Sequence, residues 1–267
     1  HCIDPGGHVT RLAEAFTRPK VRYELAKRGF SQSYTYFAWR NTKEELTRYF
    51  TELTGTEVRE YFRPNLWPNT PDILTDYLQH GGPPAFRARL VLAATLGASY
   101  GIYGPAFECC EHRPREEGSE EYLASEKYKI RHWDLQQPHN LRDFITRVNR
   151  IRRENPALQS DRTLHFHPID NPELLCFSKY HAATSNAVLV VVNLDPYHAH
   201  TGWLELQLEA LGLDPEQAYQ MHDELSNARY LWQGTRQYVA LDPQVAPAHI
   251  FHVRRRVRTE RDFDYYW

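Results

Sequence analysis

The spacing of hydrophobic positions changes near residue 160 and divides the chain into two parts. In the first part, short apolar or aromatic runs alternate with stretches whose apolar residues recur at helical spacing. The runs predict strands at 9–13, 33–39, 61–66 and 98–103. The other stretches predict helices at 19–28, 42–53, 84–95 and 140–155. Alternating strands and helices favour βα units around a parallel sheet, and four rounds make half of a (β/α)8 barrel.

The second part carries strand patterns separated by turn signals. They predict strands at 164–167, 174–180, 188–194, 202–208, 218–224, 230–232, 237–241 and 248–253. Short strands at such regular spacing are typical of an antiparallel β-sandwich. The predicted fold class is therefore α/β plus all-β. We expect a partial (β/α)8 barrel at 1–158 and a carboxyl-terminal β-sandwich domain at 159–267.

Composition and charge exclude several classes of function. Hydrophobic residues make up 41% of the 267 residues and charged residues 25%, which is typical of a globular protein rather than a disordered one. A mean hydropathy of -0.67 argues against a membrane span, as does the lack of any run of about 18 apolar residues. The net charge of -2 argues against a general nucleic-acid-binding protein, which would carry a basic excess. We therefore expect neither nucleic acid nor membrane as a partner.

The four cysteines are scattered rather than spaced as a framework. Cys2, Cys109, Cys110 and Cys176 match neither a zinc ribbon nor a disulfide scaffold. Free thiols suit a reducing compartment, so a cytoplasmic location is expected. The chain begins with His1 rather than Met and shows no basic region followed by an apolar core. We therefore expect a fragment without a signal peptide.

Two carboxylates are the main candidates for chemistry. Glu14 follows the first predicted strand, and Asp72 follows the third in a loop stiffened by Pro68 and Pro71. Active sites of barrels lie at the carboxyl ends of the strands, so these two side chains are expected to converge. Cleavage of a glycosidic bond needs a carboxylate pair, because one group protonates the leaving oxygen while the other forms or stabilises the intermediate. Most acidic residues are solvated surface groups, so spacing alone leaves this role open.

Two histidine pairs carry a weaker signal. His165 and His167 alternate on one predicted strand, as do His198 and His200 beside another. Such pairs bind zinc when a third ligand lies at a matching spacing, and none does here. We therefore expect these side chains to lie on sheet surfaces, and we expect no metal site.

Aromatic residues reach 13% of the chain, and their faces suit sugar rings and bases alike. A well-packed aromatic core would explain this content without any ligand. Trp39, Trp67 and Trp133 are candidates for stacking on sugar rings. Trp203 and Trp232, in contrast, are expected in the core of the sandwich.

Longer motifs follow one another along the chain. They are LAEAFTRPK at 12–20, GFSQSYTYFAWRNTK at 29–43, YFRPNLWPNTPDIL at 61–74, YGIYGPAFE at 100–108, SEKY at 125–128, NRIRRENPAL at 149–158, PAHIF at 247–251 and DFDY at 262–265. In this order, they resemble the α-1,4-glucan:maltose-1-phosphate maltosyltransferases of glycoside hydrolase family 13. The resemblance extends from about residue 9 to residue 267.

The resemblance implies a reaction and a set of site residues. Enzymes of that family take maltosyl units from α-maltose 1-phosphate, add them to the non-reducing end of an α-1,4-glucan and release phosphate. The anomeric configuration is retained through a covalent maltosyl-enzyme. Glu14 matches the general acid/base, Asp72 matches the carboxylate that stabilises the transition state, and Lys127 with Tyr128 matches a substrate-binding pair. The resemblance also implies no metal or organic cofactor, a homodimer in full-length form, and a role in bacterial glycogen metabolism in the cytoplasm.

The nucleophile of that family has no match in this chain. It is an aspartate on the fourth barrel strand, ahead of the acid/base, whereas only 13 residues precede Glu14 here. Asp4, among them, does not fit the family's pattern. We therefore expect a carboxyl-terminal fragment that carries barrel strands 5 to 8, lacks the nucleophile and is inactive by itself.

Two other functions stay open. A non-catalytic glucan-binding or structural remnant would fit the missing nucleophile. An α-amylase-type hydrolase would share the fold and use water in place of the glucan acceptor. Common amylases carry His-Asp where this chain has NTPD at 69–72, which favours the transferase over the hydrolase.

Overall fold

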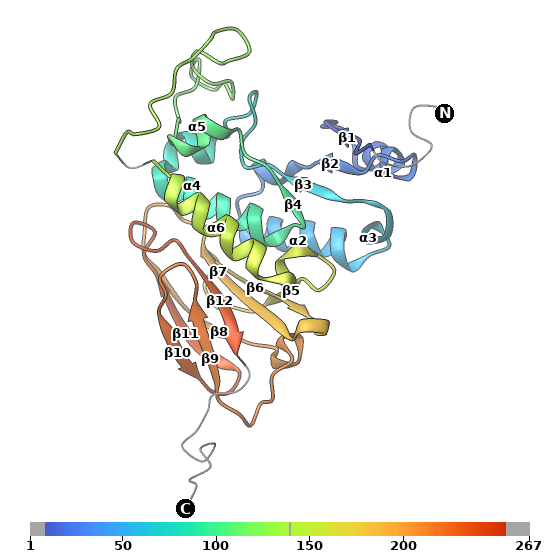
Figure 1. Cartoon of the computed structure of the whole chain (residues 1–267), viewed down its shortest axis with the longest axis vertical. Coiled ribbons are helices and arrows are strands. Elements are labelled where there is room, and N and C mark those ends of the chain that lie inside the picture. Colours follow the sequence, from blue (N-terminus) through green and yellow to red (C-terminus); the bar gives the residue numbers. More distant parts are fainter. Residues whose placement is uncertain (1–8, 139, 255–267) are drawn as a thin grey trace, which may run out of the picture.

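Four short parallel strands form a sheet in the first half of the chain, in the order β1-β2-β3-β4. The computed structural model describes residues 9–138 and 140–254 (Figure 1). The strands are β1 (Leu12–Ala13), β2 (Gln32–Tyr34), β3 (Pro64–Leu66) and β4 (Ser99–Tyr100). Each strand pairs in parallel with the next, which confirms the predicted parallel sheet. Asp4 and Cys2 lie outside the described residues.

Helices connect these strands and continue to the second half of the chain. They are α1 (Pro19–Lys27), α2 (Lys43–Gly55), α3 (Val58–Tyr61), α4 (Asp76–Leu96), α5 (Gly104–Glu108) and α6 (Arg142–Glu154), with the 3-10 helices η1 (Tyr36–Trp39) and η2 (Pro156–Gln159). Helix α2 begins as predicted, because Thr42 and Glu45 form a capping box. The Thr42 hydroxyl accepts from the Glu45 N–H at 3.2 Å, and the Glu45 carboxylate accepts from the Thr42 N–H at 3.2 Å.

Two elements of this half differ from the prediction for local reasons. The strand predicted at 33–39 ends at Tyr34, because the Thr35 hydroxyl accepts a hydrogen bond from the Phe37 N–H at 3.4 Å and starts η1. The helix predicted at 84–95 is present, but a further helical segment precedes it from Asp76, and the two are joined in α4 across a kink. Gly82 has a φ of 59°, which kinks the chain and lets the helix restart at the two prolines that follow.

The second half forms two antiparallel sheets. A six-stranded sheet has the order β10-β9-β12-β7-β6-β5, and β11 and β8 form a two-stranded ribbon. The strands are β5 (His165–His167), β6 (Leu174–His181), β7 (Asn186–Asn193), β8 (His200–Glu205), β9 (Tyr219–Asp223), β10 (Arg229–Trp232), β11 (Arg236–Leu241) and β12 (Ala248–Arg254). All eight strands predicted for this part are present, and every pairing is antiparallel.

The six-stranded sheet has two buried faces with different partners. On β6, Leu175 and Phe177 pack into one core with residues of α4 and α6, whereas Leu174 and Cys176 pack into a second core with residues of β8 and β11. Side chains alternate between the two faces of a strand, so one strand supplies both cores. Figure 1 shows α4 and α6 above this sheet, and α4 contacts β7. The first core is therefore shared by both halves of the chain.

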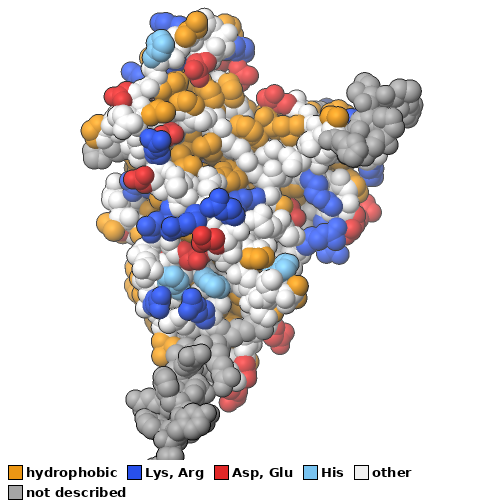
Figure 2. Space-filling view, viewed as in Figure 1, with side chains coloured by type: hydrophobic (Ala, Val, Ile, Leu, Met, Phe, Trp, Pro, Cys, Tyr) orange, Lys and Arg blue, Asp and Glu red, His pale blue; other side chains and the backbone are white. Residues whose placement is uncertain are grey.

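The exposed side of α6 is basic. The helix carries Asp143 in its first turn and Arg152 and Arg153 in its last, which complements the helix dipole. Figure 2 shows Lys and Arg side chains in a band across the middle of the molecule, below a region richer in hydrophobic side chains.

Within the described residues, no helix has both the length and the apolar character needed to cross a membrane.

Two expectations for the sandwich are wrong. Trp203 is 42% exposed rather than in the core, because Gly202 and Leu204 take the inward positions of β8 and turn the residue between them outward. His167 is buried rather than on a sheet surface, with its Nε2 2.7 Å from the Ser178 Oγ. Burial lowers the pKa of His167 to about 3, so the imidazole is neutral at pH 7.

Trp232 lies where the sequence predicted it, and the His198–His200 pair has a carboxylate partner. Trp232 is partly buried and packs against the second core, as expected. His198 and His200 both bond to the same carboxylate, Asp195, at 2.8 Å and 2.9 Å. This shared acceptor explains the histidine pair without a metal, since each ring nitrogen that faces the carboxylate can donate to it.

Candidate functional site

Glu14 follows β1 directly, and its side chain is exposed. It lies close enough to Tyr34, at the end of β2, to influence its ionisation. Burial raises the pKa of Tyr34, and the negative charge of Glu14 raises it further. Phe16 follows Glu14 by two residues and packs edge-on against Tyr36 and Trp39, at 5.8 Å and 5.3 Å between ring centroids. Aromatic rings therefore line the surface beside Glu14.

Trp67 extends this aromatic surface to the third strand. It follows β3 and packs on Tyr34, with 5.1 Å between ring centroids. The backbone of Gly101, just after β4, touches the same indole so closely that a Cβ would lie 2.3 Å from the ring. Only glycine fits here, because Trp67 fills the space that a side chain would need. Tyr34 thus links the end of β1 to the end of β3.

The loop that carries Asp72 is held from within the protein. Asn69 is buried, and its Oδ1 accepts from the Tyr103 N–H at 3.0 Å while its Nδ2 donates to the Tyr122 hydroxyl at 2.7 Å. The Thr70 hydroxyl accepts from the Asp72 N–H at 3.2 Å. These bonds fix the backbone on which the Asp72 carboxylate is presented to solvent.

Three of the four predicted site residues meet at this loop. The Lys127 Nζ lies 3.0 Å from Asp72 Oδ1 and 5.4 Å from the ring centroid of Tyr128. Hydrogen bonds with Asp72 and then Tyr128 raise the pKa of Lys127. Tyr128 is 68% exposed. Among the described residues, Glu14 forms no hydrogen bond or ion pair with these three side chains, and its charge acts on Tyr34 instead.

The segment 111–137 contributes contacts that the sequence did not predict. The Trp39 indole donates to the Glu120 carboxylate at 2.7 Å, and the Trp133 indole donates to the Glu126 carboxylate at 3.3 Å. The Tyr103 hydroxyl donates to Glu126 as well. The sequence shows this segment as charged and loop-rich, and nothing in the spacing of its acidic residues identifies their aromatic partners.

Glu111 anchors the same segment at two points. Its carboxylate accepts from Arg113 at 2.9 Å and from Arg131 at 2.8 Å. Burial alone would raise the pKa of Glu111, but these guanidinium hydrogen bonds outweigh it and lower the pKa to about 2. The Arg131 guanidinium also lies 3.9 Å from the centroid of Trp133. Glu111 therefore holds in place the loop that carries Lys127.

We expect Glu111→Gln to lower the free energy of unfolding by about 2 kcal/mol at pH 7. Because the folded-state pKa is depressed, the stabilisation is present above the ordinary carboxyl pKa and is lost as pH falls toward about 2. The difference between variant and wild type should therefore shrink on acidification. Urea unfolding at several pH values measures it, with the exposed Glu117→Gln as the control. A pH-independent difference would contradict the ionic origin of the effect.

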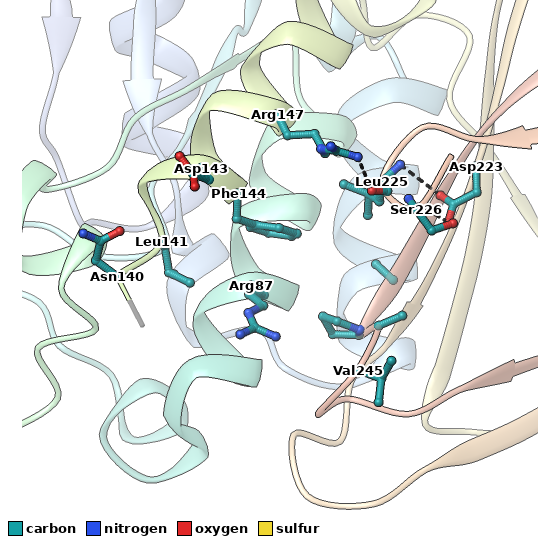
Figure 3. Close-up of a pocket in the computed structure, with 13 residues that line it drawn as sticks. Arg87, Asn140, Leu141, Asp143, Phe144, Arg147, Asp223, Leu225, Ser226 and Val245 are labelled. Atoms are coloured by element: carbon teal, nitrogen blue, oxygen red, sulfur yellow. Dashed lines mark hydrogen bonds between the residues drawn. The ribbon is translucent and has the colours of Figure 1, made fainter. Parts of the chain in front are cut away.

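A separate pocket lies at the junction of the helices and the sandwich. It has a volume of about 420 Å³ and is lined by residues of α4, α6 and the loops before β10 and β12. Figure 3 shows Arg87 and Phe144 facing the hollow, while Arg147 points to the Leu225 carbonyl, to which it donates at 2.5 Å. None of the four predicted site residues lines this pocket. It is therefore distinct from the surface at the carboxyl ends of β1–β4.

Comparison with known proteins finds one group of relatives that matches most of the chain. The family description "GLGE, C-terminal" matches residues 166–253. Alpha-1,4-glucan:maltose-1-phosphate maltosyltransferase of Methylacidiphilum infernorum is 51% identical over 242 residues, which is 91% of this chain and 36% of that protein. Maltosyltransferase 1 of Streptomyces coelicolor is 53% identical over 251 residues, covering 92% of this chain and 36% of that protein. The chain thus spans a little over a third of the length of these relatives.

Solved structures share the fold at low sequence identity. An alpha-amylase of Anoxybacillus matches with a TM-score of 0.68 at 14% identity, over 94% of this chain and 53% of that one. A gamma-CGTase from alkalophilic Bacillus clarkii matches with a TM-score of 0.62 at 15% identity, over 91% of this chain and 36% of that one. At such identities the likeness concerns the fold alone. The fold of this chain therefore also occurs in these two proteins.

Proposed function

Because this chain is homologous to the α-1,4-glucan:maltose-1-phosphate maltosyltransferases over nine tenths of its length, we propose that it serves as the carboxyl-terminal part of such an enzyme. The observation that carries this proposal is identity near one half, sustained over 91% of the chain. In the proposal, the complete protein transfers maltosyl units from α-maltose 1-phosphate to an α-1,4-glucan and releases phosphate. It acts in the cytoplasm, as a homodimer in its full-length form.

In this proposal β1–β4 are strands 5 to 8 of a (β/α)8 barrel, within a domain at 1–158. The parallel order β1-β2-β3-β4 supports it, as does the position of Glu14 directly after β1 and of Asp72 in the loop after β3. The sandwich at 159–267 follows as a second domain. A half barrel leaves two open strand edges, and the preceding part of a longer protein would pair with them.

The proposed chemistry is a double displacement with retention. A carboxylate outside this chain attacks the anomeric carbon, the bond from that carbon to the phosphate oxygen breaks, and Glu14 gives its proton to the departing phosphate. Glu14 then takes the proton of the acceptor 4-hydroxyl, whose oxygen displaces the enzyme carboxylate. Asp72 favours the positively charged transition state, and Lys127 with Tyr128 holds sugar hydroxyls. The Lys127–Asp72 contact at 3.0 Å supports a shared role for these side chains.

A chimera tests this proposal directly. The matching 36% of the Methylacidiphilum infernorum maltosyltransferase is replaced by this chain, and phosphate release from α-maltose 1-phosphate is measured with glycogen as acceptor. We expect phosphate release with elongation of the glucan, and no release from the 267-residue chain alone. A folded chimera that releases no phosphate would support a non-catalytic remnant. Release of free maltose instead of glucan elongation would support a hydrolase.

A further inference from the structure

The outer face of the β8–β11 ribbon carries three cross-strand pairs. Their register places the members directly opposite one another: Thr201 with Ala240, Trp203 with Tyr238, and Glu205 with Arg236. The inward positions of the same strands pack into the second core. The outward positions include two large aromatic residues that the core does not use.

The two rings are held in place while staying accessible. Trp203 is 42% exposed and Tyr238 52% exposed, with 5.2 Å between their centroids and 60° between their planes. The Trp203 N–H donates to the Asp170 carboxylate at 2.8 Å, which fixes the strand at this point. The Arg236 guanidinium lies 4.6 Å from the indole centroid, and its Nε lies 3.5 Å from the Glu205 carboxylate.

The size and charge of this aromatic pair restrict its partner. Together the two rings expose on the order of 200 Å² of surface, since a large aromatic side chain has roughly 150–250 Å² in all. A stable protein interface needs about 800 Å² on each partner, so the pair is too small for one. Arg236 and Glu205 neutralise each other, which gives no attraction for a polyanion or an acidic membrane. A small, uncharged ligand fits these properties.

We propose that Trp203 and Tyr238 form a surface binding site for an α-1,4-glucan chain, apart from the carboxyl ends of β1–β4. The choice of this glucan rests on the proposed function. Glucose rings present C–H faces that pack on aromatic faces, and an uncharged polymer matches a neutral surface. Two rings at 60° suit the curved path of an α-1,4-linked chain better than a flat polysaccharide. Arg236 and Glu205 border the rings and can hydrogen-bond to sugar hydroxyls.

Such a site would keep a polymeric acceptor near the enzyme between transfers. Binding at two points on one molecule raises the effective concentration of the polymer at each point. The site thus deepens the proposed function without taking part in bond cleavage.

The test is native gel electrophoresis of the 267-residue chain in gels with increasing glycogen. The double variant Trp203→Thr, Tyr238→Thr keeps β-branched residues in both strands, which protects the ribbon. Tyr197→Thr is the matched control, because Tyr197 is 57% exposed on the same sandwich. We expect glycogen to retard the wild type and Tyr197→Thr equally, and the apparent affinity of the double variant to fall at least tenfold. Circular dichroism checks folding, and Tyr238→Thr alone replaces the double variant if that variant unfolds.

Several results would overturn the site. One is a folded double variant that glycogen retards as strongly as the wild type. Another is a wild-type chain that glycogen does not retard at all. A third is a wild type that dimerises without being retarded by glycogen, together with a double variant that does not dimerise. This last result would assign the face to a second copy of the chain. Retardation by glycogen does not depend on catalytic turnover. If the chimera releases no phosphate but glycogen still retards the chain, the proposed transferase function is wrong and the proposed glucan-binding site stands.

Discussion

Glu14→Gln in the chimeric enzyme should lower kcat for maltosyl transfer by about 10²–10⁴-fold, the range expected for loss of a general acid/base. Gln keeps the size and hydrogen-bonding capacity of the side chain but neither donates nor accepts the proton at the required steps. Glu14 is exposed at the end of β1, so the substitution should leave the fold unchanged. Steady-state phosphate release measures the effect.

Azide separates a proton-transfer role from a merely structural one. Azide attacks the glycosyl-enzyme without needing a general base, so it should restore donor turnover in Glu14→Gln and yield a maltosyl azide. Glu24→Gln is the matched control, since Glu24 is an exposed carboxylate on the neighbouring helix α1. The assignment of Glu14 would be wrong if kcat fell less than tenfold, or if azide left the variant's turnover unchanged.

Phe177→Ala should lower the free energy of unfolding by about 3–5 kcal/mol, as truncation of a fully buried Phe usually does. Phe177 is 0% exposed and lies in the core that the sheet shares with α4 and α6, 6.0 Å from the ring of Phe166. Because this core belongs to both halves, the helices and the sandwich should be destabilised together. Urea unfolding followed by circular dichroism and tryptophan fluorescence measures both.

Phe177→Leu is the control, and we expect a smaller loss because most of the buried volume remains. The exposed Tyr238→Thr removes an aromatic ring from the same sandwich without opening a cavity, and it should cost less than either core variant. If Phe177→Ala produced two separate transitions with only one displaced, the two halves would not share a cooperative core.

The sequence predicted the sandwich better than the strands of the first half. In β7 and its neighbours, long apolar runs bounded by turn residues mark the strands clearly, and all eight were predicted. The first four strands are only two or three residues long, so helical segments beside them read as strand. At 33–39 the aromatic alternation continues past Tyr34, while the Thr35 side chain redirects the backbone.

The candidate site depended on contacts that sequence spacing does not encode. Resemblance identified Asp72 and Lys127, and the structure places them 3.0 Å apart. The Glu120 and Glu126 carboxylates bond to aromatic residues far away in the chain, and no local pattern marks them. Whether Trp203 points outward or into the core depends on which residues of β8 face inward. A shift of one residue along the strand would exchange the inward and outward positions.

The shared core also bears on how such proteins can be recombined during evolution. One face of the six-stranded sheet contributes Phe177, Val188 and Val190 to the same cluster as Phe86 and Leu90 of α4. A recombination event that joined this helical half to an unrelated sandwich would replace one side of a close-packed surface and leave voids or overlaps there. The boundary between the two halves is therefore a poor crossover point, and we expect them to be inherited as a pair. Exchange between lineages should be tolerated instead at exposed turns within the sandwich, such as the one between β10 and β11.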